Sequence, residues 1–174
     1  PKTMRITVDG ALGAGVTAKD LALHWIAELG ADGARGHAIE YAGPAVRALS
    51  MEGRLTLCNL SIEGGARLGL VAPDQVTFDY IKGRNFAPKG ADWDTALRDW
   101  SQLATDTDAR FDREVAINAS DIAPTVTWGT SPEEALPITG HVPDPARLSG
   151  SKQAQARAAL EYMALEPGMA LDQI

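Results

Sequence analysis

Residues 5–30 read RITVDGALGAGVTAKDLALHWIAELG, and this stretch decides the fold class. Residues 5–9 alternate between polar and apolar side chains in the manner of a β-strand, and the glycine-rich residues 10–15 predict a turn after it. Thr17 and Asp20 then form a capping-box pattern, which predicts a helix that begins at Thr17. The apolar residues after it recur at helical spacing, and the last glycine of the stretch predicts the helix end. The chain therefore begins with a β-α unit.

The rest of the chain continues this alternation of strand and helix signals. The predicted strands are short and apolar, and they cover residues 37–41, 68–71, 113–118 and 125–128. The predicted helices have apolar residues at helical spacing or high helix propensity, and they cover residues 51–63, 73–83, 93–104 and 152–165. We expect residues 68–71 to be buried, and Trp93 and Trp100 to lie in the core. Alternating elements with short connections predict an α/β fold, a three-layer α/β/α sandwich with helices on both faces of a mainly parallel or mixed sheet.

Composition excludes several classes of function. The chain has 174 residues, of which 45% are hydrophobic and 22% charged, as is ordinary for a globular protein. It has no long uncharged apolar run, so we expect no membrane span. The net charge of -7 argues against nucleic-acid binding, which requires clustered Lys and Arg. A single cysteine fits a reducing compartment, and we expect a cytoplasmic protein.

Residues 50–69 read SMEGRLTLCNLSIEGGARLG and carry the best candidates for chemistry. Residues four apart lie one above the other on a helix, so we expect Asn59 and Glu63 to share its polar face. The expected apolar stripe on the other side consists of Met51, Leu55, Cys58 and Ile62. Glu63 would lie at the negative end of the helix macrodipole, where a carboxylate costs up to about 1 kcal/mol. From the residues alone, a solvated polar face is the favoured interpretation.

Four segments closely resemble the middle of the large subunits of 3-isopropylmalate dehydratases, a branch of the aconitase family. The segments are residues 1–20, 39–74, 78–94 and 121–132, and the resemblance extends to about residue 145. The run CN-x-x-x-E at residues 58–63 is shared with aconitases generally. The resemblance implies an aconitase-type α/β domain within a longer hydro-lyase. The complete enzyme would interconvert 2- and 3-isopropylmalate in leucine biosynthesis, using a 4Fe-4S cluster and a partner, the isopropylmalate dehydratase small subunit.

The resemblance also implies that this chain holds no cluster. In the family, three cysteines in a G-S-C-T-N-S strand-turn and a later C-x-x-C run bind the iron, and neither motif occurs here. We therefore expect residues 1–149 to form the middle α/β domain and residues 150–174 to be a helical lead-in to the cluster-binding domain. The fragment alone is expected to be inactive. Two alternatives are a homoaconitase-type or other substituted-malate dehydratase, and a free-standing, non-catalytic binding or interaction module.

Residue roles follow from the same resemblance. Glu63 matches the family glutamate that orients an active-site histidine, and Asn59 matches an asparagine near the cluster. Cys58 is expected to be a buried structural residue, because one thiolate without cysteine partners cannot hold a cubane cluster. The three histidines, His24, His37 and His141, have no metal-ligand spacing, so no metal ligand is expected within this chain.

A second candidate region is the loop after the strand at residues 125–128. Thr130 and Ser131 lie in this loop, and open α/β sheets bind ligands beyond their strand ends. These two residues are weak candidates for the rim of the substrate site. A simple turn explains the same sequence equally well.

Overall fold

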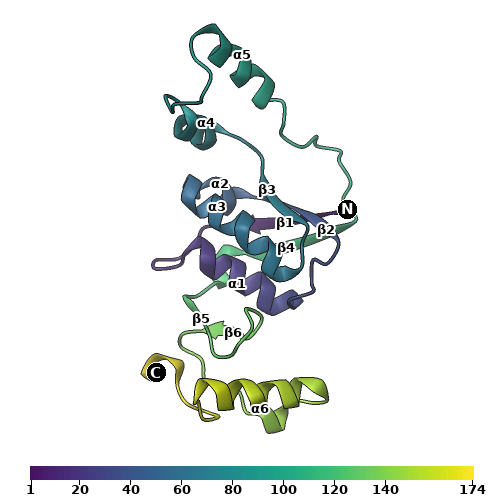
Figure 1. Cartoon of the computed structure of the whole chain (residues 1–174), viewed down its shortest axis with the longest axis vertical. Coiled ribbons are helices and arrows are strands. Elements are labelled where there is room, and N and C mark those ends of the chain that lie inside the picture. The colour runs from purple at the N-terminus through teal and green to yellow at the C-terminus, as the bar shows by residue number, and fades with distance from the viewer.

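The structure, a computed structural model, describes residues 1–174 and consists of a central sheet with two smaller lobes (Figure 1). The central sheet has the strand order β3-β2-β1-β4, and every neighbouring pair is parallel. Its strands are β1 (Lys2–Asp9), β2 (His37–Ala42), β3 (Leu68–Val71) and β4 (Arg113–Asn118). The predicted α/β class with a mainly parallel sheet is confirmed.

Six α-helices accompany the strands. They are α1 (Ala18–Leu29), α2 (Pro44–Arg47), α3 (Met51–Leu60), α4 (Gln75–Ile81), α5 (Ala91–Trp100) and α6 (Ser151–Met163). None of them combines the length and the apolar character that crossing a membrane requires. Helix α1 begins as predicted, because the Thr17 N–H donates to the Asp20 carboxylate at 2.7 Å and the Asp20 N–H donates to the Thr17 hydroxyl at 3.4 Å. The capping box therefore fixes the entry into α1.

Helices α1 and α3 cover one face of the central sheet (Figure 1). Side chains alternate along β1, so Met4, Ile6 and Val8 are fully buried on this face. They pack in one core with Leu21 and Trp25 of α1. The main core thus lies between the sheet and these helices.

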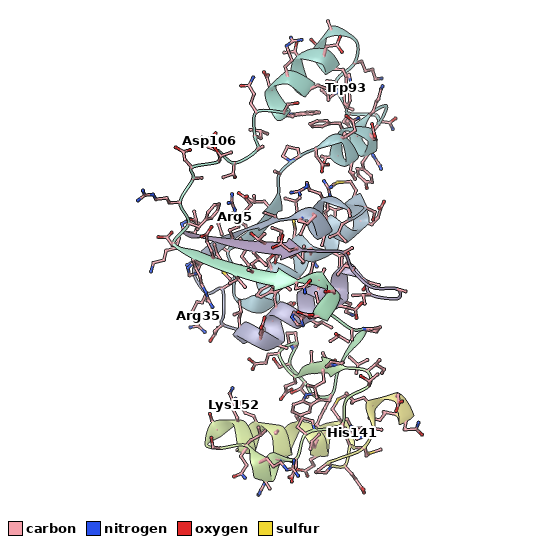
Figure 2. All side chains as sticks on the ribbon, turned by 180° about the vertical axis from the view of Figure 1, so that it is seen from behind. Arg5, Arg35, Trp93, Asp106, His141 and Lys152 are labelled. Atoms are coloured by element: carbon pink, nitrogen blue, oxygen red, sulfur yellow. The ribbon has the colours of Figure 1, made fainter.

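The opposite face of the sheet carries polar side chains, and no helix lies over it (Figure 2). Arg5 of β1 pairs there with Glu40 of β2 at 3.2 Å, and the guanidinium carbon of Arg5 lies 4.2 Å from the centre of the Phe111 ring. The structure differs here from the expected sandwich, since residues 1–174 form the helical layer on one face only. Ion pairing and contact with water satisfy the polar side chains of this uncovered face.

Strand β3 forms where it was predicted, but its expected burial was wrong. Leu68 and Leu70 are 41% and 44% exposed. Strand β3 is at the edge of the sheet, and Leu70 is in register with Glu40 on the uncovered face. An apolar run of four residues therefore predicts a strand, but it does not predict whether the side chains of that strand are buried.

Helices α4 and α5 form a small lobe at one end of the molecule (Figure 1). The rings of Phe78 and Trp100 stack with centroids 6.3 Å apart, and Trp93 meets Trp100 edge to face at 5.9 Å. The prediction that both tryptophans lie in the core was wrong, because α5 has no buried residue. One neighbouring helix is enough to half-cover these rings, so they form a local aromatic cluster instead.

The second lobe contains β5 (Thr125–Thr127), β6 (Ala135–Pro137) and α6. Strands β5 and β6 pair antiparallel as a hairpin, and β6 was not predicted. A separate hydrophobic cluster joins the hairpin end to α6 through Trp128, Val142 and Leu160. The apolar side of helix α6 therefore packs against residues that precede it in the chain. The domain division expected between residues 149 and 150 stays a prediction.

The two lobes extend away from the sheet, and the surface area reflects this. The accessible surface is 10266 Å², whereas a compact protein of 18.4 kDa exposes about 8200 Å². The hairpin of the second lobe nevertheless contacts α1, and that contact creates the site described next.

Candidate functional site

A cleft between α1, the end of α3 and the β5–β6 hairpin brings together three of the four predicted site residues. Its volume is about 550 Å³, and Glu63, Thr130 and Ser131 line it. The other lining residues come from the same three elements and are Lys19, Leu23, Leu60, residues 125–127, Gly129 and Pro132. Asn59 is not among them. The cleft thus joins the CN-x-x-x-E run to the loop that follows β5.

Glu63 lies on a short 3₁₀ turn, Ser61–Gly64, that follows directly after α3. The turn is closed by Gly65, whose φ of 84° is in the left-handed region that favours glycine. The Ala66 N–H donates to the Ser61 carbonyl at 3.1 Å, and the Ala34 N–H donates to the Gly64 carbonyl at 2.8 Å. The backbone that carries Glu63 is therefore fixed from both sides, while the Glu63 side chain is exposed.

The close packing beneath this turn requires glycine at two positions, Gly64 and Gly69. A Cβ at Gly64 would overlap the indole ring of Trp25, and a Cβ at Gly69 would overlap the hydroxyl of Ser61. Ser61 is fully buried; its hydroxyl donates to the Leu57 carbonyl at 3.2 Å and accepts from the Tyr41 hydroxyl at 2.8 Å. Burial raises the pKa of Tyr41, so its hydroxyl stays protonated and able to donate. The GG signal in the sequence thus reflects close packing as well as the helix end.

Helix α3 is anchored by Arg54, a residue that the sequence analysis missed. Its side chain is only 2% exposed, and all five of its N–H groups are satisfied. The guanidinium makes two hydrogen bonds to the Asp74 carboxylate, at 2.6 and 2.8 Å, and the others go to the carbonyls of Leu49 and Arg47 and the hydroxyl of Thr77. The hydrogen bond from Arg54 lowers the pKa of Asp74, which also caps α4.

The apolar stripe expected on α3 was therefore wrong. Leu55 is 52% exposed and Ile62 is 57% exposed, whereas Arg54 and Leu57 are buried. The buried side is rotated by one position because a fully hydrogen-bonded arginine occupies its centre. Nothing in the local spacing signals this, since the partner of Arg54 comes from the next helix.

The loop that carries Thr130 and Ser131 is held by Glu134, a second residue that the sequence analysis missed. One carboxylate oxygen of Glu134 accepts from the N–H groups of Thr130 and Ser131, at 2.7 and 3.0 Å. A Cβ at Gly129 would overlap this carboxylate. The order Ser131-Pro-Glu-Glu134 is a capping-box pattern, and it was the signal that could have identified Glu134. The two backbone amides are thus occupied, whereas the hydroxyls of Thr130 and Ser131 make no hydrogen bond within the chain.

Two long-range hydrogen bonds fix the hairpin against α1. The Thr125 N–H donates to the Asp20 carboxylate at 2.7 Å, and the Ala31 N–H donates to the Glu133 carboxylate at 2.9 Å. These contacts lie near the two ends of α1. The loop at residues 128–134 is therefore held in a defined position relative to Glu63.

Asn59 and Glu63 do not share a continuous helical face, because α3 ends at Leu60 and the 3₁₀ turn follows. Asn59 is exposed and makes no side-chain hydrogen bond within the chain. The structure brings Glu63 into the cleft and leaves Asn59 outside it. The role expected for Asn59 stays a prediction.

The residues present do not fit an iron-sulfur cluster. Cys58 is half-buried against the main core, and burial raises the pKa of its thiol, which favours the neutral form over the thiolate that binds iron. No group of three or more His, Cys, Asp or Glu side chains is placed to hold a metal ion. His24 lies near Glu28 at 3.9 Å, His37 contacts the Arg35 carbonyl at 3.0 Å, and His141 lies in the second lobe (Figure 2).

Comparison with known proteins gives two findings. Residues 1–174 match the model of the aconitase family (aconitate hydratase). Over 171 residues the chain is 56% identical to the 3-isopropylmalate dehydratase large subunit of Phocaeicola vulgatus. The aligned region covers 98% of this chain and 36% of that relative, so the chain spans about a third of the relative's length. The family match includes every residue that lines the cleft.

Proposed function

Because this chain belongs to the aconitase family, we propose that it forms one part of the large subunit of a 3-isopropylmalate dehydratase. The observation that carries the proposal is 56% identity to a protein of that name over 98% of the chain. The complete protein would be a hydro-lyase that interconverts 2- and 3-isopropylmalate, a step of leucine biosynthesis. It would act in the cytoplasm together with the isopropylmalate dehydratase small subunit.

The contribution of this chain to that reaction would be made by its own side chains. Glu63 presents an unpaired carboxylate on a rigid turn, which suits a group that accepts a hydrogen bond from an imidazole N–H. Such a contact fixes the tautomer of the imidazole and raises its basicity. The histidine would come from the rest of the protein. Asn59 would lie near the cluster, and Thr130 and Ser131 would form the rim with their hydroxyl groups.

The 4Fe-4S cluster of the family would be bound outside this chain. One half-buried cysteine with a raised pKa supports that assignment, since cluster ligation requires several thiolates. The 174-residue chain alone is therefore expected to be inactive.

The test is an assay of the complete large subunit, produced with its small subunit and with iron content measured. We expect the enzyme to convert 2-isopropylmalate to 3-isopropylmalate, with a higher kcat/KM than for homocitrate, citrate or unsubstituted malate. Loss of water from the substrate forms a conjugated alkene, so ultraviolet absorbance gives a continuous signal. The matched control is the same preparation without the small subunit.

Other outcomes would contradict the proposal in distinguishable ways. A preference for homocitrate or another substituted malate would assign the protein to a different hydro-lyase of the family. If the polypeptide isolated from cells has the size of this chain, contains no iron and has no activity on any hydroxy diacid, the non-catalytic binding module is favoured.

A further inference from the structure

The cleft contains one cation and one carboxylate, and neither is paired within the chain. Lys19 is the only cationic residue among those that line the cleft, and Glu63 is the only anionic one. No ion pair of the structure includes either residue. A lysine that lines a cleft without a partner is available for a negative group of a ligand.

We propose that Lys19 binds a carboxylate of the substrate in this cleft. The inference rests on the proposed function, because it takes a branched hydroxy dicarboxylate as the ligand. The Lys19 ammonium offers three donors to a carboxylate. Glu63 would repel a second carboxylate from its own side of the cleft, so the charges orient the ligand with one carboxylate toward Lys19.

The backbone that carries Lys19 is well fixed. Lys19 lies in the first turn of α1, between the buried residues Ala18 and Asp20. Asp20 is held by Thr17 and by the Thr125 N–H at 2.7 Å, as described above. Only the lysine side chain has to be ordered when a ligand binds, which limits the entropic cost.

The uncharged walls of the cleft fit the rest of such a ligand. Leu23, Leu60 and Val126 supply aliphatic surface, and Thr127, Thr130 and Ser131 supply hydroxyl groups. An isopropyl group matches the first set, and a hydroxyl group or the second carboxylate matches the last. The combination of one cation, several hydroxyls and aliphatic side chains is what a branched hydroxy acid requires.

The test uses the complete large subunit with its small subunit and compares Lys19→Gln with the wild type. One readout is KM and kcat for 2-isopropylmalate. The other is the Kd, from titration calorimetry, of isopropylsuccinate, which keeps both carboxylates but has no hydroxyl group to eliminate. We expect Lys19→Gln to raise KM and Kd by about tenfold or more, as loss of a charge-assisted hydrogen bond predicts, with little change in kcat.

Two variants serve as controls. Lys19→Arg keeps the positive charge and should retain most of the affinity for isopropylsuccinate. Lys89→Gln removes an exposed lysine outside the cleft and should leave KM and Kd unchanged.

Unchanged KM and Kd in Lys19→Gln would overturn the inference. A lower Tm with unchanged Kd would also overturn it, because Lys19 would then pair with a carboxylate of the protein. If Lys19→Gln gives such a result while the wild type converts isopropylmalate, the inference about Lys19 fails and the proposed function stands. If the wild type neither converts isopropylmalate nor binds isopropylsuccinate, the proposed function fails as well.

Discussion

One carboxylate oxygen of Asp20 accepts a hydrogen bond from the backbone N–H of Thr125 at 2.7 Å, across 105 positions of sequence. The other oxygen accepts from the N–H and the hydroxyl of Thr17, at 2.7 and 2.6 Å. The Asp20 residue is only 8% exposed. A single carboxylate therefore starts α1 and also fixes the hairpin that carries one rim of the cleft.

Replacing Asp20 by alanine is expected to destabilise the protein by about 2–3 kcal/mol, because the N–H groups of Thr17 and Thr125 lose their acceptor. Urea unfolding of the complete protein, followed by tryptophan fluorescence, measures this change. Asp32→Ala removes an exposed carboxylate from the loop after α1 and is the matched control. Equal unfolding midpoints for the two variants would contradict the expectation.

The Asp20 contacts also predict a pH dependence. Burial acts to raise the pKa of Asp20, but hydrogen bonds from Thr17 and Thr125 outweigh it, so the folded pKa lies below its usual value. A lowered folded pKa contributes stability above the unfolded pKa of about 3.9, and this contribution is lost as pH falls through the folded pKa. Between about pH 5 and about pH 3, the wild type should lose more stability than Asp20→Asn. Parallel pH profiles would show that Asp20 does not titrate as described.

Removing the buried Arg54 guanidinium is expected to cost about 2–3 kcal/mol. In Arg54→Met the carbonyls of Arg47 and Leu49 and the half-buried Asp74 carboxylate all lose their donor. Arg54→Lys should also destabilise, since an ammonium cannot replace five N–H donors in fixed geometry. The exposed pair of Arg35 and Asp32 gives the control, and Arg35→Gln should leave the Tm unchanged. An unchanged Tm in Arg54→Lys would mean that the positive charge alone, without the five N–H donors, is enough to anchor α3.

Loss of the Glu134 carboxylate is expected to loosen the loop at residues 128–134. In Glu134→Ala the N–H groups of Thr130 and Ser131 lose their acceptor, and hydrogen exchange at both should accelerate about tenfold. Glu134→Gln keeps one acceptor oxygen and should be intermediate. Glu161→Ala, which changes an exposed residue of α6, should leave exchange in the loop unchanged. Protected amides in Glu134→Ala would mean that another group closes the loop.

Glu63→Gln in the complete enzyme is expected to lower kcat by about 10–100-fold, as removal of a group that orients a catalytic imidazole does. The Tm should change little, because the exposed Glu63 side chain makes no hydrogen bond within this chain and Gln keeps one oxygen that can accept from the imidazole. Asn59→Ala should lower kcat less, since Asn59 lies outside the cleft. Wild-type turnover in Glu63→Gln with normal iron content would remove Glu63 from the site.

Local signals predicted the elements of this fold well. The capping box of Thr17 and Asp20 and the glycine after it fixed both ends of α1, and the strand at residues 113–118 was found with its bounds. These features depend on hydrogen bonds within one turn or on alternation along one strand. The family resemblance placed Glu63 among the candidate site residues, whereas its spacing alone predicted a solvated polar face.

Features that depend on distant partners were not predictable. The burial of Arg54 depends on Asp74 in the next helix, and so the apolar stripe of α3 was placed one position away. Trp93 and Trp100 have the spacing of core residues, but only α4 is near enough to cover them. Thr130 and Glu63 line one cleft because long-range hydrogen bonds fix the hairpin against α1, and no local pattern predicts these bonds.

The carboxylate that closes the loop at residues 128–134 has a consequence for how this loop could bind an anion. Consecutive backbone N–H groups in a turn commonly form a nest that captures phosphate. In this loop the N–H groups of Thr130 and Ser131 already donate to the carboxylate of Glu134, which belongs to the same chain. An anionic group that reaches this loop would therefore find neither amide free, and its binding would depend on side chains of the cleft such as Lys19.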